Sequence, residues 1–146
     1  MIVLAPTGIA AINAGGVTIH SFFQVPFAPY VPESSFSADG KATYRFRYGK
    51  EKINIIRSID LLVIDEISMV RADLLDSVDA VLRRFRDRNK PFGGVQLLMI
   101  GDLQQLSPVV KDDEWQMLRK YYDTPYFFSS QALKQTEYCT IELKKV

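Results

Sequence analysis

Two adjacent carboxylates, Asp65 and Glu66, are the residues of this chain best placed to do chemistry. They follow Leu61–Ile64, an apolar run typical of a strand buried on both faces of a parallel sheet. Because ligands of open α/β sheets collect at the carboxyl ends of strands, Asp65 is predicted to hold Mg²⁺, directly or through water. Glu66 is predicted to orient or activate a water beside a phosphate. On this stretch alone, an acidic entry to the next helix, favoured by the helix dipole, is an equal alternative.

A second strand-like run also ends in polar residues. Val95–Ile100 is predicted to be a buried strand, and Asp102, Gln104 and Gln105 follow it. A glutamine amide at this point could donate a hydrogen bond to a terminal phosphate, although a plain polar loop is the simpler alternative. Since strands that alternate with helices imply a mostly parallel sheet, the two polar strand ends should meet at one edge. Such convergence favours a nucleotide site.

The N-terminal stretch combines a short strand with a helix start. Ile2–Ala5 is the predicted strand, and Thr7 is the predicted N-cap of a short helix that ends at Gly15. Thr18 or Ser21 is expected to begin the next helical turn. A strand followed by Thr-Gly and a helix offers backbone N–H groups to a phosphate, but an ordinary strand-to-helix turn has the same pattern.

The remaining elements are predicted from periodicity and turn residues. They are an irregular excursion with a hairpin over 26–48, helices over 50–59, 70–85 and 113–122, a turn or helix over 130–134, and short strands over 126–128 and 138–143. Within the excursion, Tyr44–Tyr48 alternates aromatic and basic residues, a pattern that could bind single-stranded nucleic acid. A half-buried hairpin with a solvated basic face is the favoured alternative. Arginines near the end of the 70–85 helix are interpreted as structural, because cations suit a helix C-terminus.

The composition is that of an ordinary globular protein, with 146 residues, 47% hydrophobic and 24% charged. This length suits one domain or less, and a net charge of +1 excludes a strongly basic coating protein but not a local basic groove. One cysteine and one histidine disfavour a zinc site within the chain. No apolar run reaches membrane-spanning length. The lone cysteine predicts a reducing, intracellular location: cytoplasmic in a bacterium, nuclear or mitochondrial in a eukaryote.

Four segments give the chain a resemblance to a known family. They are Ala5–Ala11, Gly16–Phe23, Val63–Met69, and Phe92–Gly94 leading into Gly101–Val109. In order and spacing they resemble the PIF and RecD-like DNA helicases of superfamily 1, the branch that generally moves 5′ to 3′ on single strands. The resemblance covers essentially the whole chain. It implies a RecA-like P-loop NTPase fold with a mostly parallel sheet and flanking helices, in which residues 1–146 form an incomplete first motor domain.

The resemblance also implies a role for individual residues. Asp65 would bind Mg²⁺, Glu66 would activate the hydrolytic water, and Gln105 would sense the γ-phosphate of ATP. The residues implied to bind DNA or to lie close to it are Thr7, Gly8, His20, Ser21, Pro108 and Val109. ATP and Mg²⁺ are thus the implied cofactors, and single-stranded DNA is the implied partner. Leu103 and Ser107 stand where the family commonly has an aromatic residue and a proline, which weakens the DNA assignment more than the ATP assignment.

Two parts of the family's motor are not found in this sequence. No Gly-x-x-x-x-Gly-Lys-Ser/Thr phosphate loop occurs, and the second RecA-like domain with its arginines has no counterpart. We therefore expect a fragment of an ATP-dependent DNA helicase that couples ATP hydrolysis to translocation and unwinding, inactive alone. The alternatives are a non-catalytic single-stranded DNA-binding module, or an ATPase of similar fold serving a nuclease or remodelling complex. DNA repair, recombination and telomere maintenance are the roles that the family suggests.

Overall fold

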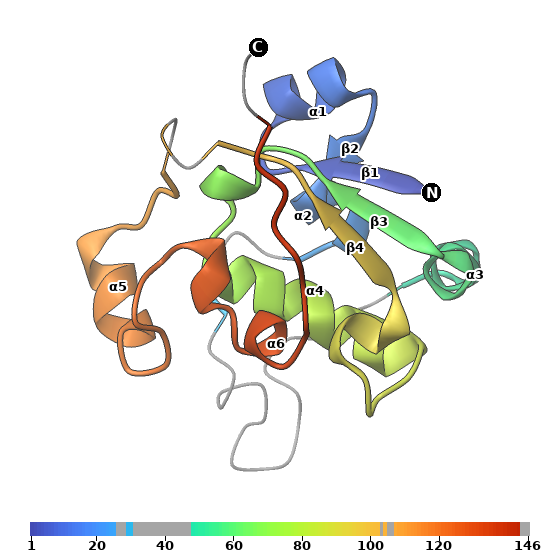
Figure 1. Cartoon of the computed structure of the whole chain (residues 1–146). Helices are drawn as coiled ribbons and strands as arrows, with labels where there is room; N and C mark the ends of the chain where they lie inside the picture. The colour runs from blue at the N-terminus through green and yellow to red at the C-terminus, as the bar shows by residue number, and fades with distance from the viewer. Residues whose placement is uncertain (26–28, 31–47, 103, 105–106, 144–146) are drawn as a thin grey trace.

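The computed structural model describes residues 1–25, 29–30, 48–102, 104 and 107–143 (Figure 1). Its centre is a sheet of four strands in the order β2-β1-β3-β4. The strands are β1 (Ile2–Ala5), β2 (Val17–Thr18), β3 (Leu61–Ile64) and β4 (Gln96–Met99). Every pairing between these strands is parallel, which confirms the predicted α/β class with a mostly parallel sheet.

Helices connect and flank the strands (Figure 1). The α-helices are α1 (Gly8–Ala14), α2 (Ile19–Phe23), α3 (Lys50–Ser58), α4 (Ala72–Phe85), α5 (Asp112–Leu118) and α6 (Gln131–Lys134). Short 3₁₀ turns are η2 (Ile67–Met69), η3 (Pro91–Gly94) and η4 (Phe127–Ser129). Among the described residues, no helix combines the length and the apolar character needed to cross a membrane.

Local sequence signals set the bounds of the first two helices. The Thr7 side chain accepts a hydrogen bond from the Ala10 N–H at 3.2 Å, and Gly15 ends α1 with a φ of 72°, as predicted. Of the two residues considered for the start of α2, Thr18 is the N-cap. Its hydroxyl accepts from the Ser21 N–H at 3.2 Å.

The sequence did not indicate β2, which is too short to show a period. Its two residues pair in parallel with the end of β1. Gly16 permits this approach, because a Cβ at that position would lie 2.2 Å from the Val3 carbonyl oxygen. The pairing brings the start of α2 beside the carboxyl end of β1.

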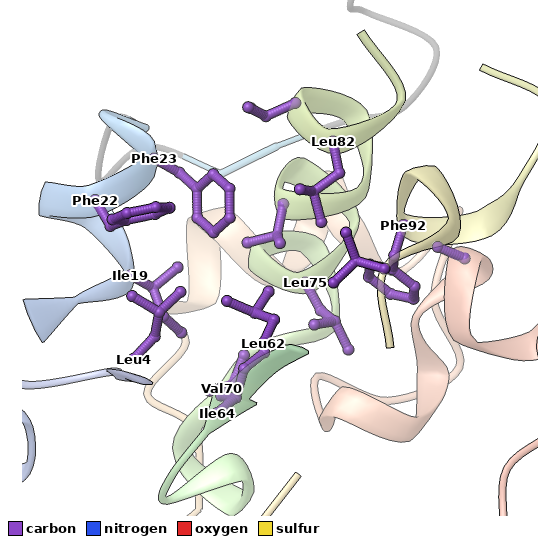
Figure 2. Close-up of a cluster of buried hydrophobic side chains, with 14 of the residues drawn as sticks. Leu4, Ile19, Phe22, Phe23, Leu62, Ile64, Val70, Leu75, Leu82 and Phe92 are labelled. Carbon is purple, nitrogen blue, oxygen red and sulfur yellow. The ribbon is translucent and has the colours of Figure 1, made fainter. Parts of the chain in front are cut away.

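The main hydrophobic core lies between the sheet and helices α2 and α4, with η3 at one end (Figure 2). On α4, Leu75, Val78 and Leu82 are fully buried at the three- and four-residue spacing that predicted an amphipathic helix. Fully burying one such side chain stabilises the fold by about 1.5–3 kcal/mol. Other large side chains in this core are Leu4, Ile19, Phe22, Phe23, Leu62, Ile64 and Phe92. This packing holds the strands, and hence their carboxyl ends, in fixed register.

The structural interpretation of the arginines near the end of α4 is confirmed for Arg83 and Arg86. Arg86 donates hydrogen bonds to the carbonyl oxygens of Ile56 at 3.2 Å and Arg57 at 2.6 Å, which joins the ends of α3 and α4. Arg83 pairs with Asp79 at 2.8 Å. α3 itself matches its predicted range closely, and the apolar face that the sequence indicated is turned inward, with Ile56 completely buried.

Val95–Ile100 was predicted to be a buried strand, and the burial is the part of this prediction that is wrong. A strand does form, but β4 pairs only with β3 and lies at the edge of the described sheet. Leu98 and Ile100 are consequently 48% and 47% exposed. An apolar run cannot by itself distinguish an edge strand from a central one, because strand order is a property of the whole fold.

Two other predicted strands are also wrong. Tyr126 makes one isolated bridge with Arg71, and the chain then turns into η4, where the Thr124 and Ser129 hydroxyls bond at 2.6 Å. Such local hydrogen bonds compete with a sheet ladder. The described chain from 138 to 143 contains no strand, and Leu143 is 92% exposed. Strand-forming residues without a neighbouring ladder do not make a strand.

Two further predictions differ or lie outside the description. α5 ends at Leu118 rather than near Tyr122, whose side chain instead turns into the protein. Most of the 26–48 excursion, including its hairpin turn and residues 44–47, lies outside the described residues.

Candidate functional site

The predicted site residues follow the carboxyl ends of neighbouring parallel strands. β1 leads into Thr7, and β3 leads into Asp65. The strand register aligns Leu4 with Ile64, and Ile64 with Met99, so the strands end at the same level. The remaining described site residues along this edge are Gly8 after β1, His20 and Ser21 after β2, and Glu66 after β3. Three neighbouring strands, β2, β1 and β3, thus lead into predicted site residues at one edge of the sheet (Figure 1).

The carboxylate pair sits in a tight, strained turn. The Asp65 N–H donates to the Leu4 carbonyl oxygen at 2.8 Å, which continues the sheet ladder for one residue. The Asp65 Oδ1 then accepts from the Glu66 N–H at 2.9 Å. Glu66 has a φ of 53° and a ψ of 44°, the left-handed conformation that side-chain-bearing residues rarely adopt. Strain of this kind is concentrated at functional sites.

The loop after β4 lies against the same turn. The Ile100 N–H donates to the Ile64 carbonyl oxygen at 2.9 Å, and the Ile67 N–H donates to the Ile100 carbonyl oxygen at 2.8 Å. Gly101 is required at this contact, because a Cβ there would lie 2.9 Å from Ile67 Cγ2. The ends of β3 and β4 therefore meet at one edge of the sheet, as the alternation of strands and helices predicted. Gln105 itself lies outside the described residues.

The Asp65 carboxylate fits a magnesium ion in the manner that this metal prefers. Mg²⁺ is commonly bound by one or two carboxylates, with waters and phosphate oxygens completing the shell. Asp65 is half-buried, and the Glu66 N–H fixes one of its oxygens, so the carboxylate has a defined orientation. No set of three or more His, Cys, Asp or Glu side chains forms a metal cluster in the described part of the chain.

The residues implied to bind DNA differ in their exposure. Gly8 and Ser21 are exposed, and Val109 is 78% exposed. The Thr7 hydroxyl is engaged as the cap of α1, and Pro108 is buried. Only part of the implied set is therefore open to solvent.

His20 is half-buried, and its surroundings favour the neutral form of the imidazole. Burial lowers the pKa of the imidazole, and the Arg71 guanidinium lowers it further, while the Asp73 carboxylate acts in the opposite direction. His20 therefore lies within the electrostatic reach of the first residues of α4, some fifty positions later in the chain.

Sequence reasoning missed a cluster of charged residues beside this site. Arg71 donates to both carboxylate oxygens of Asp73, at 2.9 and 2.8 Å, and to Glu114 Oε2 at 2.9 Å. Burial alone would lower the pKa of Arg71, but the hydrogen bonds and charges of Asp73 and Glu114 raise it. The sequence signal for this cluster was that Arg71 and Asp73, of opposite charge, lie two positions apart at a predicted helix start. Glu114 pairs with Arg71 from 43 positions away, and no local pattern in the sequence indicated this pairing.

A second missed cluster centres on the buried carboxylate of Asp76. It accepts hydrogen bonds from the Tyr122 hydroxyl at 2.6 Å, the Ser130 hydroxyl at 2.6 Å, and the N–H groups of Gln131 at 3.1 Å and Ala132 at 3.0 Å. Asp76 thus holds the start of α6 against α4. Burial raises the pKa of Tyr122, and the neighbouring Asp76 charge raises it further.

The comparison with family models decides the identity of the fold. The PIF1-like helicase model matches residues 1–146, the whole of the given sequence. The chain belongs to the PIF1-like helicase family. This confirms the family that the four sequence segments indicated, and with it the RecA-like assignment of the sheet.

Similar PIF1 proteins agree with this membership. The chain is 39% identical over 145 residues to the ATP-dependent DNA helicase PIF1 of Saccharomyces cerevisiae, and 40% identical over 150 residues to that of Homo sapiens. These alignments cover 99% and 97% of this chain but 15% and 20% of the two relatives. A crystal structure of Pif1 helicase from Bacteroides, in complex with ADP-AlF3 and ssDNA, matches with a TM-score of 0.90 at 46% identity. That match covers 99% of this chain and 32% of the Bacteroides chain.

Proposed function

We propose that this chain is part of an ATP-dependent DNA helicase, in which it supplies the magnesium-binding and water-activating carboxylates. The observation that carries the proposal is the meeting of the Asp65–Glu66 turn with the loop after β4 at one edge of a parallel sheet. The similarity to a Pif1 helicase bound to ADP-AlF3 and ssDNA supports it.

The proposed roles follow from the positions of the side chains. Asp65, oriented by the Glu66 N–H, holds Mg²⁺, which when bound neutralises charge on the phosphates. Glu66 orients the attacking water and accepts its proton, a task that suits a half-buried carboxylate held in a strained turn. Gln105, which follows β4 in the sequence, senses the γ-phosphate.

Four of the proposed DNA-binding residues, Thr7, Gly8, His20 and Ser21, follow β1 and β2 closely. Gly8 and Ser21 are exposed there, and they suit contacts to phosphate and sugar, which position a nucleic acid without reading its sequence. Thr7, His20, Pro108 and Val109 complete the proposed set. Roles in DNA repair, recombination or telomere maintenance, and an intracellular location, rest on the family resemblance and are proposals of the same kind.

The test is ATP turnover by the full-length product of the gene, with and without single-stranded DNA. Because Glu66→Gln keeps the shape of the side chain but removes the base, we expect turnover to fall by about 10²–10⁴-fold. Glu51→Gln, an exposed carboxylate change on α3, is the matched control and should leave turnover unchanged. Residues 1–146 alone should show negligible turnover. Full activity in the Glu66→Gln protein, or steady turnover by residues 1–146 alone, would contradict the proposal.

A further inference from the structure

The charged cluster of Arg71, Asp73 and Glu114 joins three parts of the described chain through hydrogen bonds: the start of α4, α5 and Tyr30. The side chains of all three are largely buried, with exposed fractions of 15%, 5% and 17%. The guanidinium bonds both oxygens of Asp73 and one oxygen of Glu114. A forked guanidinium can hold two carboxylates at fixed angles, which the single point charge of a lysine cannot do.

Arg71 is joined to the carboxylate turn by a short, rigid path. The Met69 N–H donates to the Glu66 carbonyl oxygen at 3.0 Å, and the Val70 N–H donates to the Ile67 carbonyl oxygen at 3.0 Å. These bonds form η2, which leads directly into Arg71 at the start of α4. A shift of Arg71 therefore moves the backbone that carries Glu66.

Glu114 places α5 on the other side of the cluster. α5 follows the loop after β4, and its Leu118 packs in a second small core with Ala72 and Tyr122. The ion pair between Arg71 and Glu114, at 2.9 Å, and this apolar contact hold α5 against the start of α4 (Figure 1). The cluster thereby sets the position of the chain that leads out of the proposed phosphate-sensing loop.

Tyr30 and His20, from the N-terminal part of the chain, also interact with the cluster. The Tyr30 N–H donates to Asp73 Oδ2 at 3.0 Å. The imidazole of His20 experiences the charges of both Arg71 and Asp73, in opposite directions. Tyr30, the start of α4 and α5 thus meet at one ion-pair cluster, and His20 lies within its electrostatic reach.

We propose that Arg71 is a positioning residue that couples occupancy of the DNA-binding residues Pro108 and Val109 to the hydrolytic site, by holding the Glu66 turn and α5 in one arrangement. This inference rests on the proposed function. Arg71 contacts no reacting group in this scheme. It acts through Asp73 and Glu114 on the backbone that carries the catalytic residues.

The experiment measures ATP turnover against ATP concentration, with and without saturating single-stranded DNA, in the full-length gene product and its variants. In Arg71→Met we expect the ratio of DNA-stimulated to unstimulated kcat to fall by about 2- to 30-fold, while the KM for ATP stays within about twofold. Arg71→Lys should restore part of the stimulation, because it returns the charge without the fork. Glu114→Gln should reduce the stimulation in the same direction as Arg71→Met.

Arg83→Met is the matched control, because Arg83 forms a comparable, partly buried ion pair with Asp79 on the same helix. A merely structural role predicts the same effect on stimulation for both arginines, and that result would overturn the inference. So would an unchanged ratio of stimulated to unstimulated turnover in folded Arg71→Met. If Arg71→Met does not fold, the ratio of stimulated to unstimulated turnover is measured in Arg71→Lys and Glu114→Gln, and an unchanged ratio in both overturns the inference. Wild-type protein without DNA-stimulated turnover would instead refute the proposed function.

Discussion

Removing the hydroxyl of Tyr122 should reveal how much the buried Asp76 network contributes to stability. The hydroxyl donates to Asp76 Oδ2 at 2.6 Å, and both residues are almost fully buried. A hydrogen bond to a charged group contributes about 1.5–3 kcal/mol. Since three other donors still reach the carboxylate in Tyr122→Phe, we expect a loss of about 2 kcal/mol rather than the roughly 3–5 kcal/mol of an uncompensated buried charge.

The stability difference between wild type and Tyr122→Phe should change with pH above about 10, the usual pKa of tyrosine. The folded-state pKa of Tyr122 is raised, first by burial and then by Asp76, whereas in the unfolded chain it is about 10. The unfolded state therefore loses this proton first, and stability contributed by the hydroxyl is present below about pH 10 and declines above it. The difference between wild type and Tyr122→Phe should accordingly narrow as the pH rises past about 10.

Urea denaturation of residues 1–146 measures both effects, with far-UV circular dichroism for the whole chain and Trp115 fluorescence for the neighbourhood. Trp115 is the only tryptophan and packs against the cluster that contains Tyr122. A loss of about 2 kcal/mol corresponds to a fall of about 4–8 °C in Tm for a domain of this size. Tyr138→Phe, at a side chain 52% exposed, is the control and should change stability by less than about 0.5 kcal/mol. Equal behaviour of the two variants at neutral pH, or a difference that does not change between pH 9 and pH 11, would refute the reasoning.

Two further outcomes are expected. Because His20 is the single histidine, its pKa can be measured without ambiguity by NMR titration, and we expect it below the usual 6.5. In Arg71→Met the pKa of His20 should rise, because the variant removes a cation and leaves Asp73. An unchanged pKa in Arg71→Met would contradict the placement of His20. Because its folded pKa is lowered, His20 should also cost stability as the pH falls below about 6.5. In denaturation experiments, Glu66→Gly should be more stable than Glu66→Ala by about 1–2 kcal/mol, because only alanine has a Cβ that disfavours a positive φ. Equal stabilities of the two variants would show that the turn is not strained.

The parts of the fold that could be predicted are those decided by neighbouring residues. The Thr7 cap and the Gly15 stop depend on contacts within one turn of helix, and the sequence shows them directly. The apolar spacing of α4 similarly reflects a single buried face. The position of Asp65 at a strand end followed from a buried run interrupted by charge. Each of these signals lies within a few residues of the structure it predicts.

The errors concern properties that only the assembled sheet decides. Whether Leu98 is buried depends on which strand lies beside β4, and whether residues 138–143 form a strand depends on a free ladder within reach. β2 exists because Gly16 lets two residues approach β1, and two residues have no period. The Arg71 partner Glu114 and the Asp76 partner Tyr122 lie 43 and 46 positions away. No local pattern could have paired them.

These long-range pairs give α4 a role that its amphipathic pattern does not show. Its apolar face packs on the sheet, as predicted, but polar residues of its first two turns bind segments far along the chain. Asp73 binds the Arg71 fork and the Tyr30 backbone, and Asp76 binds Tyr122 and the start of α6. Buried carboxylates are costly unless they are fully hydrogen-bonded, so an apolar residue at either position would serve a purely structural helix as well. Their presence in the first two turns of α4 is better explained by a need to fix separate segments, Tyr30 and α5 at one position and Tyr122 and α6 at the other, against the helix that follows the Glu66 turn.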